Sequence, residues 1–192
     1  MSNLRERRRL ETAREIQQTT IELIQKHGFD QVTTGAISRH LGISHRTFFN
    51  YYANKESALI GLGPKIPEEA IARFLANSDQ SNQSLKQLML ENTLDIEPHR
   101  TVLLTMQEII NDHPKVSQLQ LVGMAKMREE LGQVLAQKYP DSSPLALNIL
   151  AEILLYSSWT SVLLWLNESV ELELAFEKSW SALGDVTKVF MS

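Results

Sequence analysis

The sequence contains no cysteine and little glycine or proline, which supply only eight and six of its 192 residues. Without cysteine the chain can form no disulfide framework, no thiol nucleophile and no cysteine-ligated zinc or iron–sulfur centre. The shortage of glycine and proline argues against collagen-like, disordered and turn-rich all-β chains. A cysteine-free chain is also compatible with a reducing compartment, and we expect a cytoplasmic protein.

The sequence also lacks internal repeats and any useful length of strand-like alternation. Apolar residues instead recur at three- and four-residue steps, which is the period of amphipathic helices. We therefore predict an all-α fold of about nine helices. Four glycines and prolines fall within 61–67, so we divide the chain there into a domain over 1–60 and a second over 61–192.

No set of residues suited to catalysis or metal binding is apparent. The five histidines form no metal-ligand pattern with a carboxylate between them, and no Ser/His/Asp set is recognisable. The glycine-containing stretch 61–65 has the wrong spacing for a phosphate-binding loop. We therefore predict that the protein is not an enzyme and holds neither a metal nor a cofactor.

One apolar run, 145–166, is long enough to cross a membrane and carries a single charge, Glu152. Its polar residues Asn148, Glu152, Tyr156 and Thr160 are four apart, however, and so form one stripe along a helix. No basic flank orients the run as a membrane span. We predict a helix of a soluble bundle instead.

The net charge of −4 is spread unevenly. Residues 1–60 hold nine basic and six acidic groups, which gives +3, whereas 61–192 hold ten basic and seventeen acidic groups, which gives −7. Such asymmetry points to a polyanionic partner for the basic part. A solvated helix that binds nothing explains the same charges.

Two short helices are expected at 33–41 and 45–52, with Thr33 and Ser44 as their N-caps. Gly42 lies between them and can take the positive φ that reverses the chain. Two helices joined by such a turn describe a helix-turn-helix, in which the second helix enters the DNA major groove. An ordinary corner of a helical protein is the alternative.

The second short helix carries side chains that suit DNA. Arginine can bond guanine and asparagine can bond adenine through two hydrogen bonds each. Tyr51, Tyr52 and Lys55 lie at its far end, where they suit phosphates. The candidate base contacts are Ser44, His45, Arg46, Thr47 and Asn50.

The segment 33–59 resembles the DNA-binding region of the TetR/AcrR regulators. The resemblance includes the preceding His27-Gly28-Phe29 and the tail formed by Tyr52, Lys55, Glu56 and Leu59. It covers roughly the first 60 residues, and the rest of the chain matches only in length and helical layout.

The resemblance implies that Thr33, Lys55 and Tyr51 contact DNA phosphates, with Tyr51 at a position where many members have histidine. Two residues depart from the family pattern. Arg46 stands where many members have glycine or alanine, so we predict that it reads a base. Phe49 replaces a frequent tyrosine and lacks the hydroxyl that could bond a phosphate.

We expect the first helix to cover 11–27 and to be preceded by a mobile basic tail. Its resemblance to the basic N-terminal arms of other TetR/AcrR regulators implies that this tail reaches into the minor groove or follows the DNA backbone. A solvated terminus without a specific role is the alternative. The residues concerned are Arg5, Arg7, Arg8 and Arg9.

For the acidic second domain, 61–192, the resemblance implies that the last two helices, 145–167 and 172–190, form a homodimer interface. The helices within 68–139 would enclose a pocket for a small-molecule effector. Aromatic and methionine walls with few charges suggest a bulky apolar or amphipathic ligand, although plain core is the simpler explanation of each of these apolar residues. Asn148 and Glu152 would orient the ligand, or would only satisfy each other in the bundle. The candidates are Phe74, Met89, Met106, Met124, Met127, Asn148, Glu152, Tyr156 and Trp159.

These features together predict a ligand-responsive regulator of transcription. The expected form is a homodimeric repressor on a palindromic DNA operator, released by the effector. Two alternatives remain: a helical protein-interaction module without specific DNA binding, and an activator on the same scaffold.

Overall fold

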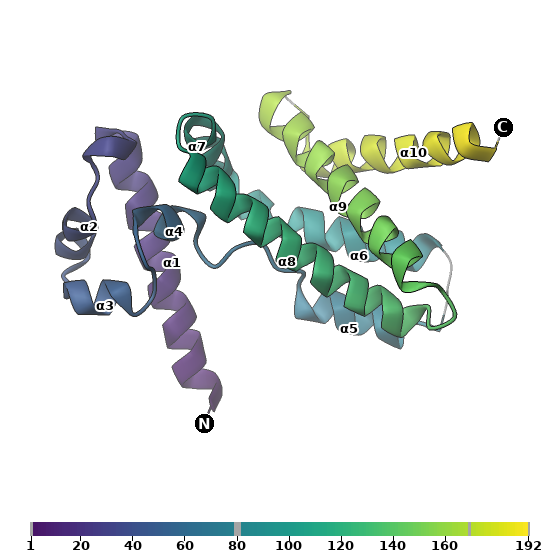
Figure 1. Ribbon diagram of the computed structural model, residues 1–192, viewed down its shortest axis with the longest axis horizontal. Coiled ribbons are helices and arrows are strands. Elements are labelled where there is room, and N and C mark those ends of the chain that lie inside the picture. Colours follow the sequence, from purple (N-terminus) through teal and green to yellow (C-terminus); the bar gives the residue numbers. More distant parts are fainter. Residues whose placement is uncertain (1, 79–81, 169, 192) are drawn as a thin grey trace. The chain divides into compact units, whose positions relative to one another are not determined.

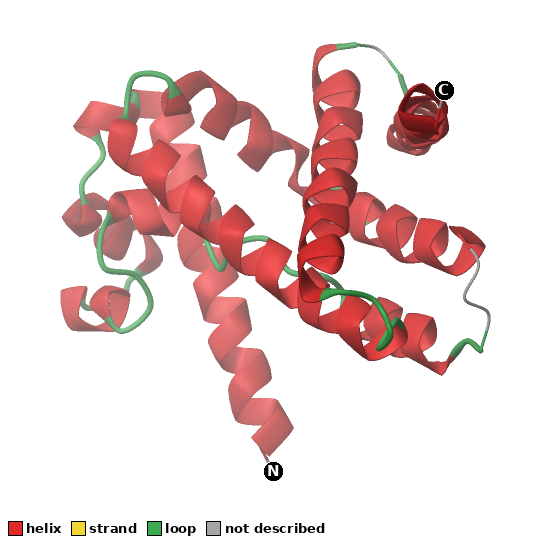
Figure 2. Cartoon of the chain, turned by 45° about the vertical axis from the view of Figure 1, so that its right-hand side comes forward, coloured by secondary structure: helices red, strands yellow, loops and turns green. Residues whose placement is uncertain are grey.

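A computed structural model describes residues 2–78, 82–168 and 170–191 (Figures 1 and 2). These residues form ten α-helices, two short 3₁₀ helices and loops, without a strand, which confirms the all-α prediction. In chain order the elements are α1 (Ser2–His27), η1 (Phe29–Gln31), α2 (Thr34–Leu41), α3 (His45–Phe49), α4 (Lys55–Ile60), α5 (Glu68–Ala76), α6 (Asn82–Leu94), η2 (Glu97–His99), α7 (Arg100–Ile110), α8 (Pro114–Lys138), α9 (Pro144–Asn167) and α10 (Leu172–Met191).

The helices separate into two compact units. Unit 1 combines Met1–Gly63 with Thr101–Gly123, and unit 2 combines Pro64–Arg100 with Met124–Ser192. The first boundary lies three residues beyond the predicted one at 60. The segment 101–123, which we placed in the second domain, belongs to unit 1 because its apolar side chains are buried there.

The core of unit 1 is built on α1. Ile16 and Ile21 are fully buried, and they share one apolar cluster with Ile37 of α2 and Phe48 of α3. Val116, near the start of α8, is fully buried in the same cluster. The short helices therefore gain their stability from burial against α1, since isolated helices of this length are marginal in water.

Side-chain caps begin the short helices where the sequence predicted them. The Thr33 hydroxyl accepts the Ala36 N–H at 3.1 Å, and the Ser44 hydroxyl accepts the Thr47 N–H at 3.0 Å. Each cap satisfies one of the N–H groups that the first helical turn leaves without a partner. The predicted N-caps of both short helices are therefore confirmed.

The prediction of a tail before the first helix was wrong. Helix α1 begins at Ser2, so Arg5, Arg7, Arg8 and Arg9 lie within it. Residues 2–12 contain no glycine or proline, and therefore nothing stops the helix from extending. The first buried side chain is that of Ala13, and Figures 1 and 2 show α1 running well beyond α2, α3 and α4 at its N-terminal end.

Unit 2 has its own apolar core. Phe74 of α5, Met89 of α6, Leu131 of α8 and Phe176 of α10 share it with α9. By length and composition α9 passes as a membrane span, but half of its most apolar stretch is buried within the protein. That burial is what a core helix of a bundle shows, which agrees with the prediction for 145–166.

Gly42 tests the helix-turn-helix turn. Its φ is +66°, and an added Cβ would meet no atom within 4 Å. Gly42→Ala should therefore act through the backbone alone and lower the free energy of unfolding by about 1–2 kcal/mol.

Gly184 in α10 is the matched control, because an added Cβ there also meets open space but the residue does not have a positive φ. Gly184→Ala should stabilise the protein by about 0.5–1 kcal/mol. Urea unfolding followed by circular dichroism measures both, and equal shifts of the same sign would contradict the assigned turn.

Candidate nucleic-acid interface

Helices α2 and α3 meet in a tight turn. The Ile43 N–H donates to the Ser38 carbonyl at 3.0 Å, across Gly42 in its left-handed conformation. Ser38 is buried, and its hydroxyl donates to the Thr34 carbonyl at 2.8 Å. A small buried residue with an internally satisfied hydroxyl therefore lies at the turn between the two helices.

The two faces of α3 differ sharply. Phe48 is fully buried in the core of unit 1, whereas His45, Arg46 and Asn50 are exposed. At 3.6 residues per turn, Arg46 and Asn50 lie on the side opposite Phe48, at the centre of the exposed face. Of the five candidate base contacts, the structure thus places Arg46 and Asn50, which can each form two hydrogen bonds with a base, on one accessible surface.

Ser44 and Thr47 have an additional structural task. Besides the cap described above, their hydroxyl oxygens lie 2.8 Å apart and share a hydrogen bond. Thr47 is half-buried. Both remain predicted DNA contacts, but their hydroxyl groups already serve to begin α3.

Gly35 makes room for His45. A Cβ added at Gly35 would lie 3.0 Å from His45 Nε2, which is tighter than an ordinary contact. The imidazole ring of His45 therefore rests directly against the start of α2. It also meets the ring of Phe49 edge-on, with centroids 5.9 Å apart.

Tyr52 anchors the chain just after α3. Its hydroxyl donates to the Ala13 carbonyl at 3.1 Å, and the side chain is buried. Burial raises the pKa of Tyr52 from 10.0 to about 12. Tyr52 was considered as a phosphate contact, but its hydroxyl holds the end of the recognition segment to α1 instead.

Lys55 also makes internal contacts. Its Nζ donates to the Phe29 carbonyl at 2.7 Å and lies 4.2 Å from the centroid of the Phe29 ring. An ammonium group has three donors, so two remain for a phosphate. Thr33 is exposed and Tyr51 half-buried. The phosphate contacts of these three residues stay predictions.

Segment 101–123 makes contacts with the rest of unit 1 that were not predicted from the sequence. The rings of His113 and Phe29 lie with their centroids 4.1 Å apart and are tilted by 40°, and Gln25 Nε2 donates to Thr105 Oγ1 at 3.1 Å. Lys115 pairs with Glu56 at 3.7 Å. Partners about 60 to 80 residues apart leave no local pattern, so only the buried apolar residues of 101–123 hinted at a core position.

The predicted ligand-lining residues do not come together in one pocket. Phe74, Met89 and Met127 are buried in the core of unit 2, but Met106 is buried in that of unit 1. Met106 thus packs in a different core from the other buried candidates, and its part in a ligand site stays a prediction. The others are half-buried (Met124 and Trp159) or exposed (Asn148, Glu152 and Tyr156, with Glu152 paired to Arg128 at 3.0 Å).

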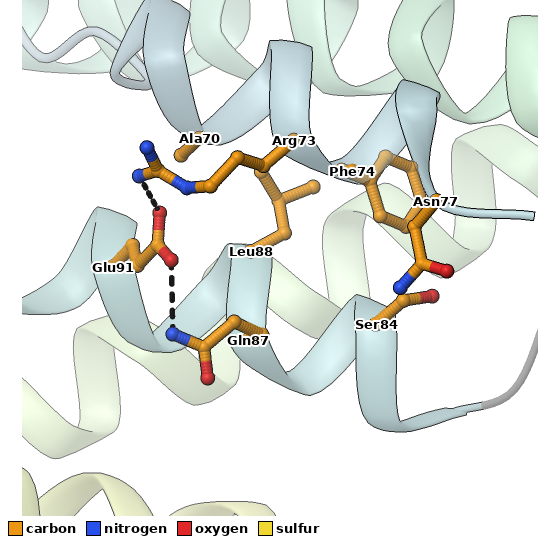
Figure 3. Close-up of a pocket in the computed structure, with 8 residues that line it drawn as sticks. All are labelled: Ala70, Arg73, Phe74, Asn77, Ser84, Gln87, Leu88 and Glu91. Atoms are coloured by element: carbon orange, nitrogen blue, oxygen red, sulfur yellow. Dashed lines mark hydrogen bonds and ion pairs between the residues drawn. The ribbon is translucent and has the colours of Figure 1, made fainter. Parts of the chain in front are cut away.

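Two hollows in unit 2 come closest to a ligand site. The first, of about 190 Å³, lies between α5 and α6, and Figure 3 shows the Arg73–Glu91 ion pair across it. The second, of about 300 Å³, lies between α8 and α9 and touches Asn148. Drug-sized ligands generally fill about 300–1,000 Å³, so the first is too small for a bulky effector. Among the described residues, no group of three or more acidic or histidine side chains is placed to hold a metal.

Comparison with known proteins identifies the DNA-binding segment. Residues 16–60, which include α2, α3 and α4, match the family profile described as bacterial regulatory proteins, tetR family. The segment 16–60 is therefore a tetR-family segment. It is also 45% identical over 51 residues to MftR of Mycobacterium tuberculosis, whose name links it to transcriptional regulation of mycofactocin biosynthesis. That stretch spans 27% of this chain and only 26% of MftR.

Solved structures extend the likeness to the whole fold. FadR of Thermus thermophilus, a TetR-family repressor in complex with lauroyl-CoA, is similar with a TM-score of 0.58 and 22% identity over 89% of this chain and 92% of that one. A Syntrophomonas wolfei protein described as a TetR-family regulator has a TM-score of 0.67 and 14% identity over the same shares. At such identities the likeness shows the fold alone, and the TetR-family fold predicted from the sequence is confirmed.

Tyr52 gives a test of how the interface is held. Tyr52→Phe removes a buried hydrogen bond and should lower the free energy of unfolding by about 1 kcal/mol at neutral pH. Because the folded state favours the protonated hydroxyl, wild-type stability should fall as the pH rises from 10.0 to about 12. The fall is at most about 1.4 kcal/mol per pH unit.

Tyr52→Phe should lose this part of the alkaline decline, which urea unfolding at a series of pH values would measure. Phe49→Leu, which alters a neighbouring ring without an ionisable group, should keep the wild-type profile. Identical profiles for wild type and Tyr52→Phe would contradict the role assigned to the hydroxyl.

Proposed function

We propose that this TetR-family protein regulates transcription, and is not an enzyme, by binding double-stranded operator DNA through α3. The observation that carries the proposal is the two-sided character of α3: Phe48 is fully buried, and Arg46 and Asn50 project from the opposite face. Guanidinium and carboxamide groups on one accessible helix face suit the donor and acceptor pattern of the major groove. A DNA-binding regulator acts in the cytoplasm, which is the location that we propose.

The basic end of α1 supports the same partner. Arg5, Arg7, Arg8 and Arg9 are exposed on a helical extension of roughly 16 Å, at 1.5 Å per residue. An α-helix is about 10–12 Å wide, whereas the minor groove is about 6 Å wide. A helical arm therefore suits phosphates along the DNA backbone better than insertion into the minor groove.

The proposal is tested by a gel shift on DNA from upstream of the protein's own gene. Arg46→Ala should weaken binding to the preferred sequence by about 1–3 kcal/mol and relax the preference at one base pair. Lys126→Ala removes an exposed charge on α8, far along the chain from α3, and should leave binding unchanged. If Arg46→Ala weakened binding to preferred and to random DNA by the same factor, Arg46 would contact a phosphate and not a base.

We further propose that the chain acts as a homodimer through α9 and α10. The supporting observation is a row of exposed apolar side chains along α9, formed by Leu145, Ile149, Ile153 and Tyr156. Residues three and four apart share a helix face, and such a stripe on a surface indicates a partner. A two-fold dimer would present two copies of α3 to a palindromic operator.

Ile149, which is 53% exposed, lies in the middle of this row. Ile149→Glu should weaken dimerisation by about 3 kcal/mol or more, because a symmetric interface loses two buried isoleucines. Light scattering after size-exclusion chromatography should then show monomers, with weaker operator binding. Leu121→Glu, at a site 69% exposed on α8, is the matched control and should remain dimeric. A wild-type protein that is monomeric at all concentrations would rule out the dimer.

The proposed regulator is a repressor that a bulky apolar or amphipathic molecule releases from DNA. Lauroyl-CoA in FadR shows that a protein of this fold can hold an amphipathic ligand. In this chain Phe74, Met89 and Met127 are the buried candidates for the apolar wall. A ligand relieves repression only by as much as it prefers the state that does not bind DNA. Loss of the shifted band on adding lauroyl-CoA or related amphipathic compounds is the corresponding test.

A further inference from the structure

Phe49 is an exposed apolar residue on the helix proposed to enter the major groove. Its side chain is 51% exposed, and it follows Phe48, which is fully buried. The neighbouring exposed residues of α3, His45 and Arg46, carry hydrogen-bonding groups. Phe49 can neither donate nor accept a hydrogen bond, so it suits neither a phosphate oxygen nor the polar edge of a base.

The ring of Phe49 is nevertheless held in place. It meets the Phe48 ring at a centroid distance of 5.5 Å and an interplanar angle of 86°. It meets the His45 ring at 5.9 Å and 82°. Edge-to-face pairs of this kind are favourable beyond the area they bury. His45 in turn rests against Gly35, where even a Cβ would lie 3.0 Å from its Nε2. Phe48, His45 and Gly35 therefore fix the apolar ring of Phe49 at the surface, so that binding costs little conformational entropy for this side chain.

The major groove offers one apolar group on its base edges, the C5-methyl of thymine. We infer that Phe49 is a specificity residue that packs against a thymine methyl in each half of the operator. This inference rests on the proposed DNA binding and adds an apolar contact to the polar ones of Arg46 and Asn50. Since Phe49 lies three residues from Arg46, on the flank of the exposed face, the thymine should lie near the base pair that Arg46 reads.

Deoxyuridine tests the inference because it differs from thymidine only by this methyl group. Wild-type protein would first select its preferred duplex from a random library, and each thymine would then be replaced in turn. At one thymine per half-site we expect the replacement to weaken wild-type binding about fourfold, the ratio that burial of one methyl group gives. Fluorescence anisotropy of labelled duplexes measures the ratio.

Phe49→Ala should bind both duplexes with the same affinity, so that the ratio falls to about one, while Phe49→Leu should keep part of the preference because it retains an apolar side chain. Leu62→Ala, which truncates a side chain 57% exposed in the same unit, should keep the wild-type ratio. Unchanged circular dichroism would confirm that the variants are folded.

The outcomes separate the two proposals. Sequence-specific binding that is indifferent to every thymine methyl would overturn the role of Phe49 and leave the proposed function standing. An unchanged ratio in Phe49→Ala would do the same. A wild-type protein that prefers no sequence to random DNA would overturn the proposed function itself.

Discussion

The attachment of the recognition segment to α1 is the constraint on which the rest of unit 1 depends. The Tyr52 hydroxyl donates to the Ala13 carbonyl at 3.1 Å, and Gln17 Nε2 donates to the Leu59 carbonyl at 3.1 Å. The Leu59 carbonyl lies in the last turn of α4, where helical carbonyls lack an intrahelical partner. The Ala13 carbonyl lies inside α1 and can accept the Tyr52 hydroxyl through its second lone pair. Gly61 belongs to the same arrangement, because a Cβ there would lie 2.3 Å from the Gln17 side chain. These contacts fix the buried side of α3 and the end of α4. The opposite side of α3 stays exposed to solvent and is held in a defined position, which suits the proposed binding to DNA.

The chain passes between its two units three times: after Gly63, after Arg100, and within helix α8 after Gly123. The first part of α8, up to Gly123, belongs to unit 1, and the remainder from Met124 belongs to unit 2. The start of the helix is tied to unit 1 by Val116 in the core and by the Lys115–Glu56 pair. That pair is largely exposed on its lysine side and contributes little to stability, whereas the burial of Val116 is worth more. Under the proposed release by an effector, a continuous helix with its start buried beside α1 can carry a displacement that a glycine- and proline-rich linker would absorb.

The sequence predicted the local features of the interface and missed the non-local ones. Thr33, Ser44 and Gly42 act on residues one to four positions away, so their residue types indicate the caps and the turn directly. The start of α1 was missed because the basic residues were interpreted as a tail, although nothing in 2–12 ends a helix. Met106 was assigned to a ligand pocket because an amphipathic helix shows that it has a buried face but not which core buries it. That choice depends on contacts between residues far apart in the chain, which a single sequence does not record.

Several side chains that were predicted to contact DNA already form hydrogen bonds within the protein. Ser44 and Thr47 use their hydroxyl groups to begin α3, and Lys55 uses one of its donors for the Phe29 carbonyl. Arg46 and Asn50 are the hydrogen-bonding side chains of α3 and its C-cap that lie opposite Phe48. Hydrogen bonds from two such residues specify few base pairs. An apolar contact from a fixed ring such as that of Phe49 adds discrimination without requiring another buried polar group to be satisfied. A recognition helix of five residues therefore gains most from combining both kinds of contact.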